Sequence, residues 1–113
     1  MELTGKCKEE FEKWYFKNYV KTTKKFKDLY PHEYSDIYDW FYNLQESMKY
    51  GVLEDYFDSV GAYVEILQID QGKEFYWAIN DDEMTDGSEE TRPEARTAAI
   101  EKANELRNEV LNK

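Results

Sequence analysis

The sequence predicts an α+β fold in which helices pack on a small antiparallel hairpin or short sheet and the chain ends in a helix. Three observations favour this class. Apolar residues recur at three- and four-residue intervals in the first half, β-branched and aromatic residues flank a glycine turn at residues 62–80, and a helix-capping signal opens residues 91–111. A chain of 113 residues fits a single domain with one modest core.

The first predicted helix covers about residues 3–18. Its apolar face consists of Leu3, Cys7, Phe11, Trp14 and Tyr15. Either Thr4 or Glu2 is the expected N-cap, because short polar side chains can accept a hydrogen bond from the first turn. A connection is expected over about residues 20–32, since Pro31 restricts the residue before it to extended geometry.

Two further helices are predicted, over about residues 33–44 and 47–60. Their spacing of aromatic and aliphatic residues is typical of helices with one buried face. Ser47 is the expected N-cap of the later helix, and Gly61 is placed to end it in a left-handed cap. Gly51 lowers helix preference inside this segment, which indicates close packing by a neighbour or a later helix start.

The hairpin at about residues 62–80 has two strands, AYVEILQID and EFYWAIN, joined by a turn in which Gly72 can adopt positive φ. A two-stranded ribbon is marginal in water, so we expect helical cover or a short third strand near residues 83–90. Residues 81–90 are otherwise predicted to be an acidic loop. The two strands therefore need support from the rest of the chain.

The last predicted helix covers about residues 91–111. Thr91 and Glu94 form a capping box, and Pro93 is tolerated in the first turn. The narrow apolar face consists of Ala95, Ala98, Ala99, Ala103, Leu106 and Val110. Alanines of this kind allow a close approach between the helix and the hairpin.

The charge distribution excludes most nucleic-acid-binding classes. The net charge is −10, and residues 31–90 alone carry two lysines against sixteen acidic residues. Such a segment repels phosphates, so no direct contact with nucleic acid is expected. No apolar run is long enough to cross a bilayer, the N-terminus lacks the order of a secretory signal, and Cys7 has no second cysteine to pair with. These features predict a cytoplasmic protein without a membrane contact.

No catalytic, cofactor-binding or metal site is predicted. Asp82, Asp86 and Gly87 match three positions of a calcium-binding EF-hand loop, but Met84 and Pro93 occupy positions where ligands are required. The single histidine, His32, precedes no recognisable nucleophile, and no sequence signal places a partner beside Cys7. We therefore expect no enzymatic activity and no cofactor.

Three segments resemble a family of short, uncharacterised proteins carried by phages and prophages of gut Bacteroidota. They are MELTGKCKEEFEKWY at the N-terminus, SMKYGVLEDYFDSVG before the hairpin and TRPEARTAAIEKANEL after it. The resemblance covers about residues 1–18 and 47–108, whereas residues 20–46 depart from the shorter connection expected of that family. It implies a bacterial host cytoplasm during infection or lysogeny, and it brings no activity or catalytic residue with it.

The aromatic content of 17%, with ten tyrosines, predicts that some rings reach the surface, because each buried hydroxyl needs a hydrogen-bond partner. The candidate interaction surface consists of Trp40, Tyr42, Tyr50, Glu54, Asp58, Asp81, Asp82 and Asp86. We predict an accessory protein that binds a host or phage protein through this surface. A mimic of DNA that inhibits a host nucleic-acid-binding or defence enzyme, with carboxylates in rows on one face, and a homodimer that buries its aromatics remain alternatives.

Overall fold

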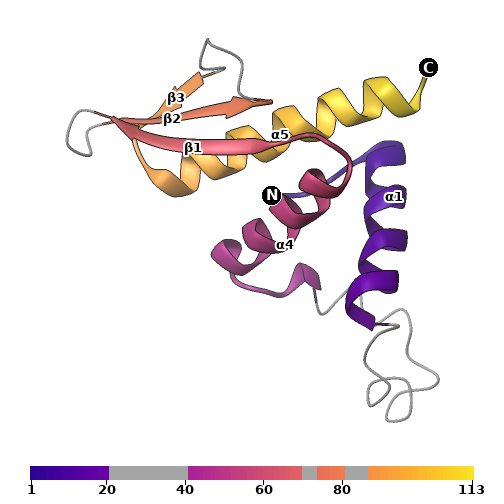
Figure 1. Ribbon diagram of the computed structural model, residues 1–113. Helices are drawn as coiled ribbons and strands as arrows, with labels where there is room; N and C mark the ends of the chain where they lie inside the picture. The colour runs from indigo at the N-terminus through magenta and orange to yellow at the C-terminus, as the bar shows by residue number, and fades with distance from the viewer. Residues whose placement is uncertain (21–40, 70–73, 81–86) are drawn as a thin grey trace.

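The computed structural model describes residues 1–20, 41–69, 74–80 and 87–113. In chain order, the helices and strands are α1 (Gly5–Tyr15), the π-helical turn η1 (Phe16–Val20), α4 (Glu46–Ser59), β1 (Val64–Ile69), β2 (Glu74–Ile79), β3 (Gly87–Glu89) and α5 (Arg92–Leu111). Helices packed with a three-stranded antiparallel sheet and a C-terminal helix confirm the predicted α+β class (Figure 1). The predicted connection at residues 20–32 lies almost wholly outside the described residues, as does most of the helix at 33–44, of which Phe41 and Tyr42 are helical.

The sheet has the order β1-β2-β3, and both pairs of strands are antiparallel. Val64 pairs with Ile79 at one end of β1, and both side chains are buried. Leu67, which points to the other face, is 46% exposed. One face of the sheet therefore packs on α5, as the alternation of apolar residues predicts.

The strand β3 occupies Gly87–Glu89, inside the segment predicted as an acidic loop. Gly87 pairs with Trp77, and a Cβ atom at Gly87 would lie 2.7 Å from the Trp77 ring. The ring thus covers a position that only glycine can fill, which allows this short segment to hydrogen-bond to β2. The prediction of a loop over 81–90 is wrong for these three residues, and the expected third strand is present there.

The helix α5 contacts α1, α4 and all three strands. Ala95, Ala99 and Ala103 lie along its buried face with no exposed surface. Small side chains let the neighbouring backbones approach closely, as the alanine pattern predicts. The predicted face is wrong at its C-terminal end, because Val110 is 53% exposed.

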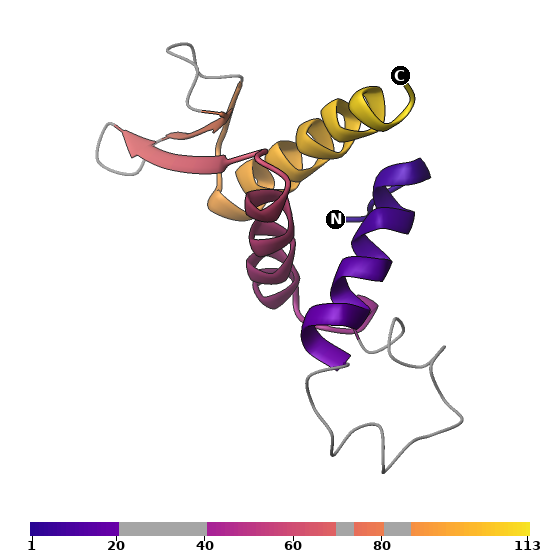
Figure 2. The same ribbon diagram turned by 45° about the vertical axis from the view of Figure 1, so that its right-hand side comes forward.

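Aromatic rings fill the core between α1 and α4. The centroid of the Phe11 ring lies 4.8 Å from that of Phe41 and 5.3 Å from that of Tyr56, the latter in an edge-to-face arrangement. Phe57 extends this cluster, with its ring centroid 4.9 Å from that of Tyr56. In both views the sheet and α1 lie at opposite ends of the molecule, with α4 and α5 between them (Figures 1 and 2).

The sequence predicts the C-terminal end of α4 correctly but not its N-terminal end. Gln45 is the N-cap residue and makes no side-chain capping bond, so Ser47 lies within the first turn and the predicted cap is wrong. At the other end Gly61 adopts a φ of 77°, and the Ala62 N–H donates to the Phe57 carbonyl at 2.8 Å. The Gly61 N–H donates to the Asp58 carbonyl, which completes the pair of bonds of a Schellman motif.

Gly51 and Gly61 provide a matched test of backbone conformation. A Cβ atom at either position would meet no heavy atom within 4 Å, but only Gly61 has a positive φ. Gly51→Ala is therefore expected to raise the free energy of unfolding by about 0.5–1 kcal/mol, because alanine has the higher helix propensity. Gly61→Ala is expected to lower it by about 1 kcal/mol, because alanine disfavours the left-handed region. Urea denaturation followed by circular dichroism measures both values, and equal effects of the two substitutions would contradict the assignment of the helix end.

Candidate functional site

The residues of the predicted interaction surface do not form one exposed patch within the described part of the chain. Trp40, Asp81, Asp82 and Asp86 lie outside the described residues. Asp58 is exposed, Glu54 and Tyr42 are half-buried, and Tyr50 is only 9% exposed. The expectation of a partly exposed Tyr50 ring is therefore wrong. The Arg96 guanidinium carbon lies 5.1 Å from the centroid of that ring and helps to cover it.

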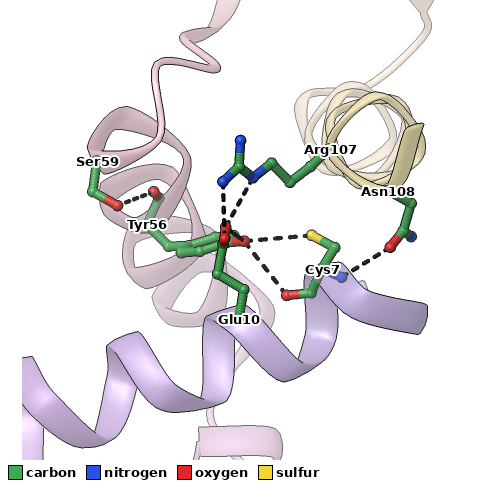
Figure 3. A network of polar contacts seen from close by, with 6 residues as sticks. All are labelled: Cys7, Glu10, Tyr56, Ser59, Arg107 and Asn108. Carbon is green, nitrogen blue, oxygen red and sulfur yellow. Dashed lines mark hydrogen bonds and ion pairs between the residues drawn. The ribbon is translucent and has the colours of Figure 1, made fainter. Parts of the chain in front are cut away.

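A network of polar side chains joins α1, α4 and α5, and we call it the polar joint (Figure 3). Arg107 of α5 donates from Nε and Nη2 to the two carboxylate oxygens of Glu10, each at 2.8 Å. The Tyr56 hydroxyl, on α4, donates to Glu10 Oε1 at 2.7 Å. Since the carboxylate of Glu10 accepts bonds from both neighbouring helices, it fixes the position of α1 against them.

Two asparagines of α5 also supply the N-terminal cap of α1. Thr4, one of the two residues expected there, occupies the N-cap position, but its side chain makes no capping bond. Asn108 Oδ1 accepts from the Cys7 N–H at 2.8 Å, which is the bond that an N-cap side chain ordinarily makes. Asn104 Oδ1 accepts from the Thr4 N–H at 3.0 Å, and its Nδ2 donates to the Thr4 hydroxyl. Gly5 permits this approach, since a Cβ atom there would lie 2.9 Å from Asn108 Oδ1.

The chemistry of the polar joint favours a structural role over nucleophilic activation. Cys7 has no exposed surface, and burial raises the pKa of its thiol to about 11. The Arg107 hydrogen bonds lower the pKa of Glu10, so this carboxyl group stays ionised and is not poised to accept a proton near neutral pH. Burial also raises the pKa of Tyr56. The joint therefore holds a neutral thiol and a neutral phenol beside a satisfied ion pair.

A cleft of about 420 Å³ lies between α4, β1 and the N-terminal end of α5. Its walls are Tyr50 and Glu54 from α4, four successive residues of β1, Val64 to Leu67, and Arg92 and Arg96 from α5. Burial and the Glu54 carboxylate raise the pKa of the Tyr50 hydroxyl, which places these two side chains together in the wall. In Figure 1, β1 is the strand nearest α4, so the cleft follows the side of the sheet.

The open edge of β1 faces this cleft. The Asn80 N–H donates to the Tyr63 carbonyl at 2.7 Å, so these two residues form a hydrogen-bonded pair of the antiparallel ladder. Such pairs alternate along the strands, which assigns the next ones to Glu65 with Ala78 and Leu67 with Tyr76. The N–H and C=O groups of Val64, Ile66 and Gln68 therefore point away from β2. Among the described residues no strand pairs with this edge.

Two arginines of the cleft have no carboxylate partner among the described residues. Arg92 Nη2 donates to Gln68 Oε1 at 3.2 Å, and its guanidinium carbon lies 5.3 Å from the Phe75 ring centroid. Arg96 lies over Tyr50 as described above. Sequence reasoning missed both arginines, although their spacing of four residues in a predicted helix indicates a shared face. Only the tertiary structure shows that this face meets the edge of β1.

A DNA mimic would need its carboxylates in rows on one face, and those expected to form the rows can be placed only in part; they are Asp39, Glu54, Asp58, Glu65, Asp81 and Asp86. Glu54 and Asp58 lie one turn apart on α4, whereas Glu65 lies on β1. Asp39, Asp81 and Asp86 are outside the described residues. In the part of the chain that is described, Glu54 shares its cleft with two arginines instead of standing in a row of acids.

The sequence led us to expect neither a metal site nor a membrane-spanning helix. Within residues 1–20, 41–69, 74–80 and 87–113, no group of three or more His, Cys, Asp or Glu side chains could hold a metal ion. His32 and most of the acidic loop lie outside these ranges. None of the helices in the described ranges combines the length and the apolar character that a membrane-spanning helix needs.

Comparison of this chain with protein-family models, with curated proteins and with solved structures found no match.

The pairing of Glu10 with Arg107 predicts a pH-dependent contribution to stability. The pKa of Glu10 is depressed in the folded state, so its contribution is complete above about pH 5 and is lost as the pH falls through the folded-state value. Glu10→Gln is expected to lower the free energy of unfolding by about 1–2 kcal/mol at pH 7. The difference from the wild type should shrink below about pH 4. Glu9→Gln removes the same charge at the adjacent exposed position and should change stability by less than about 0.5 kcal/mol. A difference for Glu10→Gln that is the same at pH 3 and pH 7 would contradict the ion pair.

The burial of Cys7 predicts that its thiol reacts only when the protein opens. At pH 8 the wild type should react with iodoacetamide about 100-fold more slowly than a small thiol, because the thiolate fraction is low and the sulfur is covered. Urea concentrations within the unfolding transition should restore the rate of the small thiol. Mass spectrometry of the alkylated chain measures this rate, and fast alkylation in native buffer would show that α1 does not lie where the polar joint places it.

Proposed function

We propose that this chain is a protein-binding module that takes an extended segment of a partner protein onto the open edge of β1. The observation that carries the proposal is the position of that edge inside a cleft. Val64 and Ile66 line a space of about 420 Å³ that is walled by α4 and α5, and their outward backbone groups pair with no strand of the described residues; those of Gln68, the next outward residue of β1, continue the same edge. Addition of a strand to such an edge is a recurring mode of peptide recognition.

The sequence of β1 supports this use of the edge. Exposed edges are ordinarily protected by lysine, proline, a bulge or a very short strand, because unpaired backbone groups otherwise recruit other chains. The segment VEILQI has six residues, contains no lysine, proline or glycine, and carries one charged side chain, Glu65. Tyr63, which directly precedes β1, and Leu67, which lies within it, are also about half exposed, at 54% and 46%. A long, unprotected and apolar edge is typical of a surface that is covered in use.

The proposed surface shares two residues with the surface expected from the sequence. Tyr50 and Glu54 line the cleft, although the main contribution comes from the backbone of β1 and from two arginines. A partner segment fits these features better than the two alternatives do. Arg92 and Arg96 lower the negative charge that a DNA mimic would need here. A second copy would bring together two whole chains of net charge −10, whereas a single partner segment meets only the charges of the cleft.

The resemblance to phage and prophage proteins of gut Bacteroidota suggests the setting. We propose an accessory protein that acts in the cytoplasm of a bacterial host, with a host or phage protein as its partner. Neither catalysis nor a cofactor is part of this proposal.

Two proline substitutions test the open edge directly. Gln68→Pro removes an N–H that points away from β2 along the open edge, so the free energy of unfolding should fall by less than about 1 kcal/mol. Leu67→Pro removes an N–H that bonds to β2, so the loss should be about 3 kcal/mol or more, although both side chains are exposed. Urea denaturation measures both losses, and equal losses would contradict the assigned pairing of β1.

The same Gln68→Pro variant tests the function. Peptides selected on the wild-type chain from a display library of random twelve-residue sequences should show alternating apolar residues. Their binding to Gln68→Pro should be at least about tenfold weaker, because the edge has lost a donor and its extended geometry is interrupted. Selection of no peptide, or of peptides that bind both forms equally, would overturn the proposal.

A further inference from the structure

We infer that the partner segment carries carboxylate side chains at alternate positions, which are bound by Arg92 and Arg96. This inference rests on the proposed function and adds the chemical class of the ligand. It means that a protein with a net charge of −10 recognises an acidic strand at one local site.

The pairing with β1 fixes the direction in which the side chains of the added strand point. In a strand added to β1, each residue opposite Val64, Ile66 or Gln68 projects its side chain to the same face of the sheet as that residue. This is the face against which α5 packs, since Val64 is 7% exposed and the Gln68 side chain accepts a hydrogen bond from Arg92. Alternate side chains of the added strand therefore point toward the N-terminal end of α5.

The spacing of the two arginines along α5 matches the repeat of side chains on one face of a β-strand. Arg92 and Arg96 are separated by one turn of α5, a rise of about 6 Å. Alternate side chains of a β-strand are about 6.6 Å apart on one face. Two carboxylates at positions i and i+2 of the added strand can thus meet the two guanidinium groups in turn.

The acidic groups near Arg92 and Arg96 do not neutralise them by ion pairing within the described residues. Neither guanidinium forms an ion pair with a carboxylate of the described residues, whereas Arg107 is fully engaged by Glu10. Glu54, the acid of the α4 wall, lies beside the Tyr50 hydroxyl. Glu65 also lines the cleft, but it alternates with Val64 along β1, so its side chain projects to the face of the sheet opposite α5. The positive charge of the α5 wall is therefore available to an occupant.

Three synthetic peptides test the inference on the full-length chain. Each has eight residues of alternating valine and threonine, and two successive threonines are replaced by glutamate, glutamine or lysine. Titration of each peptide into the ¹⁵N-labelled chain should shift the backbone amides of Val64, Ile66 and Gln68. The glutamate peptide should bind about tenfold tighter than the glutamine peptide at low salt, and the lysine peptide should bind most weakly. In 0.5 M salt the preference should fall to about twofold.

Two double variants show whether the arginines cause the preference. Arg92→Gln with Arg96→Gln should bind the glutamate and glutamine peptides equally, with the glutamine peptide bound as by the wild type. Lys102→Gln with Lys113→Gln removes the same charge from α5 and the C-terminus, outside the cleft, and should keep the preference. A glutamate preference that persists in the double arginine variant would overturn the inference.

The outcomes separate this inference from the function on which it rests. Equal affinity for the three peptides, with shifts at Val64, Ile66 and Gln68, would overturn the acidic ligand and leave the strand-binding site in place. No shift at these amides with any peptide would overturn both. In the absence of peptide, the chemical shifts of these amides could change with protein concentration. That result would show that a second copy occupies the edge, and it would also overturn the inference of an acidic ligand.

Discussion

The structure depends on the packing of α1, α4 and the three strands against α5. Ala95, Ala99 and Ala103 leave room for α4 and the sheet to approach the α5 backbone. Any larger side chain at these fully buried positions would push the layers apart, because protein interiors contain few voids that could accept it. The polar joint then adds α1 to the same helix by directional bonds. Packing sets the distances between α5 and its neighbours, and the hydrogen bonds of Glu10, Asn104 and Asn108 set the orientation of α1 on α5.

This arrangement leaves β1 at the rim. In the described part of the chain the sheet has three strands, its inner face is occupied by α5, and α4 contacts β1 without pairing with it. A helix beside an edge strand creates a cleft that is lined on one side by backbone donors and acceptors and on the other by side chains. The same α5 that organises the core thus brings Arg92 and Arg96 to that cleft. Folding and the proposed recognition consequently share one element.

The sequence predicts the elements of this fold better than it predicts their contacts. Local signals are sufficient for the Thr91 cap, the Gly61 helix end and the two strands of the hairpin, because each depends on neighbouring residues. The cap of α1 by Asn108 joins residues 101 positions apart, and no local pattern contains that information. Tyr50 shows the same limit, since its ring is covered in part by Arg96, which lies 46 residues away on α5.

The candidate site was predicted in part for a related reason. The acidic and aromatic composition of residues 31–90 is the basis on which an interaction surface was expected, and two of the expected residues, Tyr50 and Glu54, line the cleft. An open sheet edge, however, is a property of strand order, which a hairpin pattern leaves undetermined. Whether β1 or β2 faces outward depends on β3, and the pairing of β3 depends on Gly87 beneath the Trp77 ring. The edge therefore emerges only from the assembled sheet.

Hydrogen exchange along β1, followed by NMR, tests the central claim most directly. If the edge is open, the amides of Glu65 and Leu67 should be protected by their bonds to β2, while those of Ile66 and Gln68 should exchange at least about 100-fold faster. Alternation of this kind is the direct consequence of one paired and one unpaired side of the strand. Equal protection of all four amides would show that the edge is already covered in the isolated chain, and it would contradict the account.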